Sequence, residues 1–373
     1  MTNAKHNSVR TPFVRLAKRS SIGTVRAWCI RVVAVLLALV INALLIYTIT
    51  KMNPLQVYVS MFKGAFGSTR RMWNFIREGC MLLCISVALA PAFKMRFWNI
   101  GAEGQVLAGG IATAACMIYL GGKLPTPVLF LVMVLASVAA GALWGFIPAL
   151  FKAKWGTNET LFTLMMNYIA IQITSYCVAL WENPYGSNKV GIINPQTKAG
   201  WFPKLFGQQY TWNVLIVLAL TVLVFLYLKF SKQGYEIAVV GESENTARYA
   251  GINVRHVILR TMLISGAICG VAGFIGVAGV DHTISTNTAG GRGFTAIIIA
   301  WLAKFNTITM IVITSLIVFL NQGAGQIVSD FSKLGINDYV AEIIKGIILF
   351  FILGSEFFVN YRLIFRGSTK TNG

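Results

Sequence analysis

The stretch RFWNIGAEGQVLAGG, residues 96–110, places Asn99, Glu103 and Gln105 within seven residues of one another, between two apolar runs. A charged carboxyl group in the middle of a membrane costs roughly 3 kcal/mol even on a lenient insertion scale. The apolar part that follows, 106–120, has 15 residues, which is about 22 Å of helix. Because the hydrocarbon core is about 30 Å thick, this helix crosses a membrane only if the polar stretch itself lies at membrane depth.

The composition supports a membrane environment for the whole chain. Of 373 residues, 56% are hydrophobic and only 12% are charged, and the mean hydropathy is +0.68. Long apolar runs recur along the sequence without the alternation that a transmembrane β-barrel requires. We therefore predict an all-α fold, a polytopic transmembrane bundle of about ten helices. The net charge of +20 does not indicate nucleic acid, because the basic residues lie in short loops between apolar runs.

Hydropathy and turn signals divide the chain into a basic arm, 1–31, a transmembrane domain, 32–360, and a short tail, 361–373. With the N-terminus inside, the inner segments carry 20 of the 32 Lys and Arg residues. This bias predicts that both termini are cytoplasmic. We expect the membrane helices at residues 32–50, 74–93, 99–120, 127–150, 159–181, 211–229, 258–280, 290–303, 307–322 and 340–359.

A second segment is also too short to cross a membrane alone. Its apolar part, 294–303, has ten residues and follows the polar, Gly-rich run TNTAGGRG, 286–293. It lies five helices after the segment at 99–120, so the two would run in opposite directions. Paired short, Gly-interrupted helices indicate an inverted five-helix repeat and a transport site. Alternatively, 290–322 forms a re-entrant pair and the chain crosses eight times.

Two groups of polar residues are candidates for the translocation pathway. Asn99, Glu103 and Gln105 either form a buried network that joins helices, contact the transported molecule, or lie at a cytoplasmic helix end. Asn167 and Tyr168, with Gln172, belong to the segment expected at 159–181, and Asn158 directly precedes it. Their side chains could contact a solute or only pack.

The polar segment 231–256 separates two membrane helices on the expected cytoplasmic side. Ser243 can cap a short helix, and Gly251 can end it in a left-handed cap. Ala247, Ala250 and Gly251 would give this helix a face of small residues that another protein can approach. On physical grounds the helix is either a surface feature or a docking element.

Three ordered motifs carry a family resemblance: FWNIGAEGQ at 97–105, GTNETLFTLMMNYIA at 156–170 and ARYAGINV at 247–254. They resemble the membrane permease subunits of bacterial ATP-binding-cassette importers. The nucleoside-type permeases are the nearest group, within a broader family that includes ribose and branched-chain amino-acid permeases. The resemblance covers nearly the whole chain from about residue 32 onward.

The resemblance implies several partners in a bacterial cell membrane. These are an ATPase, a second and often non-identical permease subunit, an extracytoplasmic solute-binding protein, the small-molecule solute and the surrounding lipid. It also implies that 242–251 is the segment that couples to the ATPase, with Glu242, Ala247, Arg248, Ala250 and Gly251 as its candidate residues. The chain contains no G-x-x-x-x-G-K-[ST] motif, so ATP would be bound by the partner. We expect no catalytic residue, metal or cofactor in this chain.

Three alternative functions remain to be considered. The solute could be a simple, ribose-like sugar instead of a nucleoside. An ion-coupled secondary transporter would need a membrane-embedded acid, for which Glu103 and Glu159 are the candidates. A membrane enzyme is disfavoured because the chain has only three histidines and three aspartates, and neither H-E-x-x-H nor G-x-S-x-G.

Overall fold

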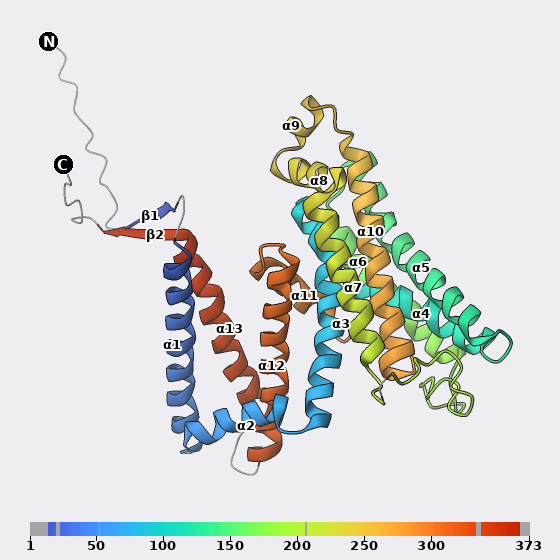
Figure 1. Ribbon diagram of the computed structural model, residues 1–373, viewed down its shortest axis with the longest axis horizontal. Helices are drawn as coiled ribbons and strands as arrows, with labels where there is room; N and C mark the ends of the chain where they lie inside the picture. The colour runs from blue at the N-terminus through green and yellow to red at the C-terminus, as the bar shows by residue number, and fades with distance from the viewer. Residues whose placement is uncertain (1–13, 20–22, 52, 206, 333–336, 366–373) are drawn as a thin grey trace. The chain divides into compact units, whose positions relative to one another are not determined.

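The computed structural model describes residues 14–19, 23–51, 53–205, 207–332 and 337–365. The chain forms two compact units (Figure 1). One combines Met1–Gly64 with Leu320–Gly373, and the other is Ala65–Phe319. We call them the terminal unit and the central unit, and describe each by itself. Parts of the predicted arm and tail, residues 1–13 and 366–373, lie outside the described residues.

The described chain is helical apart from two short strands and its loops. The elements in order are β1 (Val14–Lys18), α1 (Thr24–Thr50), α2 (Pro54–Phe66), α3 (Thr69–Lys94), α4 (Ala102–Leu120), α5 (Thr126–Trp155), α6 (Glu159–Leu180), α7 (Thr211–Phe230), α8 (Lys232–Glu242), α9 (Glu244–Tyr249), α10 (Val254–Phe274), the π-helix η1 (Ile275–Asp281), α11 (Arg292–Leu302), α12 (Thr307–Phe331), α13 (Asp338–Asn360) and β2 (Tyr361–Phe365).

The predicted all-α bundle is confirmed, and each of the ten expected membrane segments is helical. By length and composition, eight of the described helices could cross a membrane. The helix α11 is shorter, at 11 residues, or about 16 Å. The first helix begins at Thr24, within the predicted arm, and the described residues also form two helices that the sequence did not predict, α2 and α8.

A stripe of glycines on α10 forms the centre of the central unit. A Cβ atom on Gly109 of α4 would lie 2.5 Å from the Cα of Gly270. A Cβ atom on Gly270 would in turn collide with the Ser137 carbonyl oxygen of α5. The three helices therefore approach closely through bare backbone. The glycine stripe on one face of α10 is thus a packing surface.

The central unit has two distinct ends (Figure 1). At one, which we call the α9 end, α8 and α9 lie beside the last residues of α3. There Lys94 Nζ donates to the Leu228 carbonyl over 3.4 Å. At the other, the loop end, Asn194 Nδ2 donates to the carbonyl of Met117, the last part of α4, over 2.8 Å. Ile193 N donates to the His282 carbonyl over 2.8 Å.

In the terminal unit, the two short strands pair with each other. The strands β1 and β2 pair antiparallel, with Val14 opposite Phe365 and Lys18 opposite Tyr361. Below them α1 packs along α13, where Asn42 Nδ2 donates to a backbone carbonyl over 3.1 Å. The segments that the sequence reading assigned to the arm and the tail thus contribute a small two-stranded sheet.

Candidate functional site

Two of the three polar residues of the opening stretch bond to each other. The Asn99 amide and the Gln105 amide exchange two hydrogen bonds, of 3.3 and 3.1 Å. Asn99 Nδ2 also lies 3.3 Å from Ser265 Oγ on α10. Asn99 is fully buried and Gln105 is 1% exposed. Because these amides satisfy one another inside the bundle, they join the start of α4 to α10.

Glu103 has a different set of partners. Its Oε1 accepts from Gly291 N over 2.6 Å, and its Oε2 accepts from Gly293 N over 2.8 Å. These amides are at the N-terminus of α11, where a carboxylate is favoured by free N–H groups and by the helix dipole. Glu103 is 6% exposed. Glu103 thus bonds to the N-terminus of α11, while Asn99 and Gln105 bond to each other.

This contact joins the two short helices that the sequence singled out. Gly290 and Gly291 have φ values of 58° and 72°, a conformation that glycine adopts without strain. A Cβ atom on Gly293 would lie 2.7 Å from Glu103 Oε2. The glycines of TNTAGGRG thus let the backbone close around the carboxylate. Irregular backbone of this kind is stable in a membrane protein only where it lies against protein or water.

Asn167 secures the same region from α6. Its Oδ1 accepts from Gly104 N over 2.8 Å, and its Nδ2 donates to the Ile100 carbonyl over 2.9 Å. Asn167 is 3% exposed, so its amide holds the turn that begins α4. Asn158 has a local role instead, because it caps α6 by accepting from Thr160 N and Leu161 N. The Asn167 amide is therefore used within the protein, whereas the exposed Asn158 uses its Oδ1 for the cap.

Tyr168 lies on the opposite face of α6 from Asn167. Its side chain is 59% exposed, and that of Tyr176 is 69% exposed. A shallow hollow of about 430 Å³ is lined by Tyr168, Ile169, Gln172, Ile173 and Tyr176. Of the six pathway candidates, the structure therefore brings Asn99, Glu103, Gln105 and Asn167 together in the interior. It leaves Asn158 and Tyr168 on the outer side of α6.

The short helix expected after Ser243 is present as α9. Ser243 Oγ accepts from Thr246 N, as expected of an N-cap, and Gly251 has a φ of 76° just beyond the helix. Ala247, however, is fully buried, so it holds α9 against the protein. Of the expected face of small residues, only Ala250 and Gly251 are therefore exposed. The other four candidate coupling residues, Glu242, Arg248, Ala250 and Gly251, are exposed.

The most exposed large side chain of α9 is one that the sequence reading missed. Tyr249 is 94% exposed, directly before Ala250. No sequence signal distinguished it, because a tyrosine in a short polar helix can point either way. Its position follows from the burial of Ala247, which fixes the rotation of α9.

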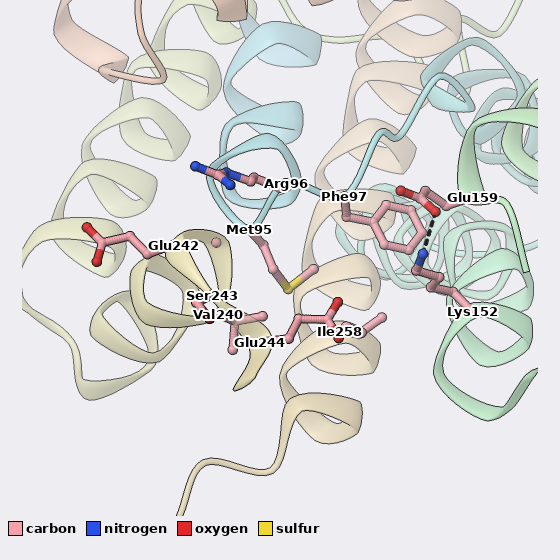
Figure 2. Close-up of a pocket in the computed structure, with 11 residues that line it drawn as sticks. Met95, Arg96, Phe97, Lys152, Glu159, Val240, Glu242, Ser243, Glu244 and Ile258 are labelled. Carbon is pink, nitrogen blue, oxygen red and sulfur yellow. Dashed lines mark ion pairs between the residues drawn. The ribbon is translucent and has the colours of Figure 1, made fainter. Parts of the chain in front are cut away.

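A small cavity of about 160 Å³ lies behind α9 (Figure 2). Its wall combines the residues that follow α3 with residues of α5, α6, α8, α9 and α10, and the dashed line marks the ion pair of Lys152 with Glu159, 2.8 Å apart. Glu159 is thus paired across the turn between α5 and α6. The cavity residues are Met95, Arg96, Phe97, Lys152, Glu159, Val240, Gly241, Glu242, Ser243, Glu244 and Ile258.

At the loop end, His282 is the second feature that the sequence did not reveal. Its ring stacks on Trp201 with a centroid distance of 3.8 Å and an interplanar angle of 5°. Gln209 Nε2 lies 3.1 Å from His282 Nε2. Burial lowers the pKa of His282 below its ordinary value. This stack fastens the long loop between α6 and α7 to the end of η1.

A bundle of apolar helices with buried polar contacts between α4 and the short helix α11, and with a polar helix at one end, is the arrangement expected of a membrane permease. The chain belongs to the family described as the permease component of the branched-chain amino acid transport system, whose model matches residues 71–353. It is a subunit of an ATP-binding-cassette transporter, and no ATPase motif occurs in its sequence.

Relatives within this family differ in the solute that their names state. The guanosine permease protein of Bacillus subtilis is 29% identical over 87% of this chain and 92% of its own length. The glucose permease protein of Haloferax volcanii is 28% identical over 91% of each chain. The nucleoside permease protein of Lactococcus lactis is 27% identical over 80% of this chain and 84% of its own. These relatives are thus all named as permease proteins, but for different solutes.

Proposed function

We propose that this permease carries nucleosides into the cell. The observation that supports this most directly is the similarity over most of the chain to permeases named for guanosine and for nucleosides. The relative named for glucose is about as similar, so a sugar is the alternative solute. An ion-coupled mechanism is set aside by membership of the family.

Transport is driven by an ATPase that docks at α8 and α9. The burial of Ala247 and the exposure of Arg248, Tyr249, Ala250 and Gly251 support this role. A helix of six residues has little stability of its own. Here the buried Ala247 holds α9 against the protein, and Tyr249 at its end is exposed. Glu242, at the end of α8, is exposed beside it.

The α9 end then faces the cytoplasm, together with both termini, and the loop end faces outward to receive solute from a binding protein. Cysteine labelling of a chain whose six cysteines are replaced tests this orientation. A cysteine at Tyr185, 95% exposed in the long loop, should react with an impermeant thiol reagent in intact cells. One at Asn245 should react only after the cells are opened. The reverse pattern would refute the orientation.

A transport assay separates the two candidate solutes. The permease is expressed with its ATPase, partner permease and binding protein, and uptake of labelled guanosine, uridine, ribose and glucose is compared. We expect ATP-dependent uptake of the two nucleosides. Uptake of a sugar but of neither nucleoside would overturn the proposed solute while leaving the transporter class intact.

A further inference from the structure

The outer surfaces of two membrane helices of the central unit establish what a lipid-facing side looks like in this protein. On α5 the exposed mid-helix residues are Leu131, Leu135, Ala139 and Leu143. On α7 the exposed mid-helix residues are Leu215, Leu218, Ala219, Val222, Leu223 and Leu226. Every one of these side chains is apolar, as contact with hydrocarbon requires.

The outer surface of α6 is different. Its exposed mid-helix residues include Tyr168, Gln172, Ser175 and Tyr176 beside the apolar Met165, Ile169 and Ile173. Gln172 receives no hydrogen bond in the part of the chain that the structure describes, although an amide in hydrocarbon needs a partner. This face therefore does not suit lipid, and it favours contact with water, a solute or another subunit.

The positions of Tyr168 and Gln172 along α6 also separate this face from an ordinary lipid-facing surface. Tyr168 is nine residues after Glu159, where α6 begins, so it lies about 13 Å along the helix axis. Gln172 is eight residues before Leu180, where α6 ends, or about 12 Å from that end. Both lie in the middle of the helix, beyond the interfacial belt in which tyrosines are common.

The outer face of α6 is also held in a fixed direction. On the inner face, Asn167 bonds to the backbone at Ile100 and Gly104. Thr163 Oγ1 accepts from Ile100 N over 3.2 Å. These contacts set the rotation of α6, so Tyr168 and Gln172 point away from the bundle.

We propose that Tyr168, Gln172 and Tyr176 form a stacking surface for the base of a nucleoside in the translocation pathway. The inference rests on the proposed function and names the part of α6 that contacts the solute. The three residues are spaced by four, so they form one stripe with successive side chains about 6 Å apart. The shallow hollow that they line together with Ile169 and Ile173 has a volume of about 430 Å³ and is open on one side.

The chemistry of the stripe fits a planar base with polar edges. Tyrosine rings stack on any nucleobase, because every base has a π face. The Gln172 amide offers one acceptor and two donors for the edge of the base. A base that leaves the Tyr168 ring can stack next on the Tyr176 ring. Each contact is then brief, as transport requires. A second permease subunit facing α6 would close this surface from lipid.

Uptake by the complete transporter tests the stacking. Tyr168→Leu should lower guanosine and uridine uptake about ten-fold at equal membrane abundance, within the range expected for loss of one base–aromatic stack. Tyr168→Phe keeps the ring and should lose at most about two-fold. Tyr47→Leu removes a tyrosine that is 55% exposed on α1 and serves as the control, with uptake like that of the wild type.

Thiol labelling provides a second measurement that does not depend on uptake. In the cysteine-free chain, Gln172→Cys should react with a charged thiol reagent, and guanosine should slow the reaction. Leu223→Cys, at a 60% exposed site on α7, should not react, because it faces lipid.

The outcomes separate the two proposals. If the wild type takes up nucleosides but Tyr168→Leu matches it, the stacking surface is refuted and the nucleoside function stands. Failure of Gln172→Cys to react, as for Leu223→Cys, would also refute it, since the face would then lie in lipid. If the wild type takes up neither nucleoside, the proposed solute fails and the stacking surface fails with it.

Discussion

Replacing Glu103 tests whether its carboxylate is what holds α11 against α4. The two bonds differ in surroundings, because Gly293 is buried and Gly291 is exposed. In Glu103→Leu both amides lose their acceptor. A buried donor without a partner costs about 1–3 kcal/mol, and the loss of the charge at the helix terminus costs up to about 2 kcal/mol more. We expect Glu103→Leu to lower stability by about 2–4 kcal/mol.

Glu103→Gln should have a smaller effect. Its one carbonyl oxygen can still accept from the buried amide of Gly293, while the exposed amide of Gly291 turns to water. The charge at the helix terminus is lost, so the expected cost is about 1–2 kcal/mol. Gly293→Ala should resemble it, because the added Cβ atom would lie 2.7 Å from Glu103 Oε2. The effects of Glu103→Gln and Gly293→Ala should not add, since both weaken one contact.

Glu182 provides a matched control. Its two carboxylate oxygens also accept from backbone amides, those of Gly186 over 2.9 Å and Asn188 over 3.2 Å, but at an exposed site. Water can replace this carboxylate, so Glu182→Leu should cost less than about 1 kcal/mol.

The measurements are membrane abundance, the thermal denaturation temperature of the purified protein and uptake. We expect all three values to be highest in the wild type, lower in Glu103→Gln and lowest in Glu103→Leu. Glu182→Leu should be close to the wild type. If Glu103→Leu is as stable and active as Glu182→Leu, the carboxylate does not hold α11. If Glu103→Gln loses all uptake at full stability, the charge itself has a transport role that the tether does not explain.

Three further changes give distinct expectations. Gly270→Ala should reduce membrane abundance because its Cβ atom has no room between α10 and α5, whereas Gly346→Ala, with nothing within 4 Å, should not; equal abundance would contradict the close packing. The lowered pKa of His282 means that the unfolded state binds more protons below about pH 6.5. The thermal denaturation temperature should therefore fall between pH 7 and pH 5 more steeply in the wild type than in His282→Phe, and parallel pH profiles would exclude this effect. Tyr249→Ala should keep the protein in the membrane but reduce uptake and stimulated ATP hydrolysis, while Ala247→Trp should disrupt α9 itself; normal uptake by Tyr249→Ala would remove that residue from the docking surface.

The sequence determined the class of fold. Apolar runs of sufficient length can only be membrane helices, and each of the ten predicted segments is helical. Length also identified α11 as too short to cross a membrane, because ten apolar residues cannot span the hydrocarbon core, whereas α4 reaches 19 residues by including the polar turn before its apolar part. The cap residues Ser243 and Gly251 were predictable for a similar reason, since capping depends on a residue and its near neighbours along the chain.

The partners of the polar residues could not be read from the sequence. Glu103 bonds to amides 188 and 190 residues further along the chain, whereas Asn99 and Gln105, close to it in sequence, bond to each other. A carboxylate accepts from any donor within reach, so composition alone cannot say which donor is near.

The rotation of each helix was likewise decided only by the tertiary structure. Tyr168 and Asn167 are adjacent in sequence, yet one is 59% exposed and the other is 3% exposed. Ala247 is buried and Tyr249, two residues later, is 94% exposed. Hydrophobic periodicity indicates which side of a helix faces a core when the other side faces water. In a membrane both sides are apolar, so the direction of each side chain is fixed by close packing and by the few hydrogen bonds between helices.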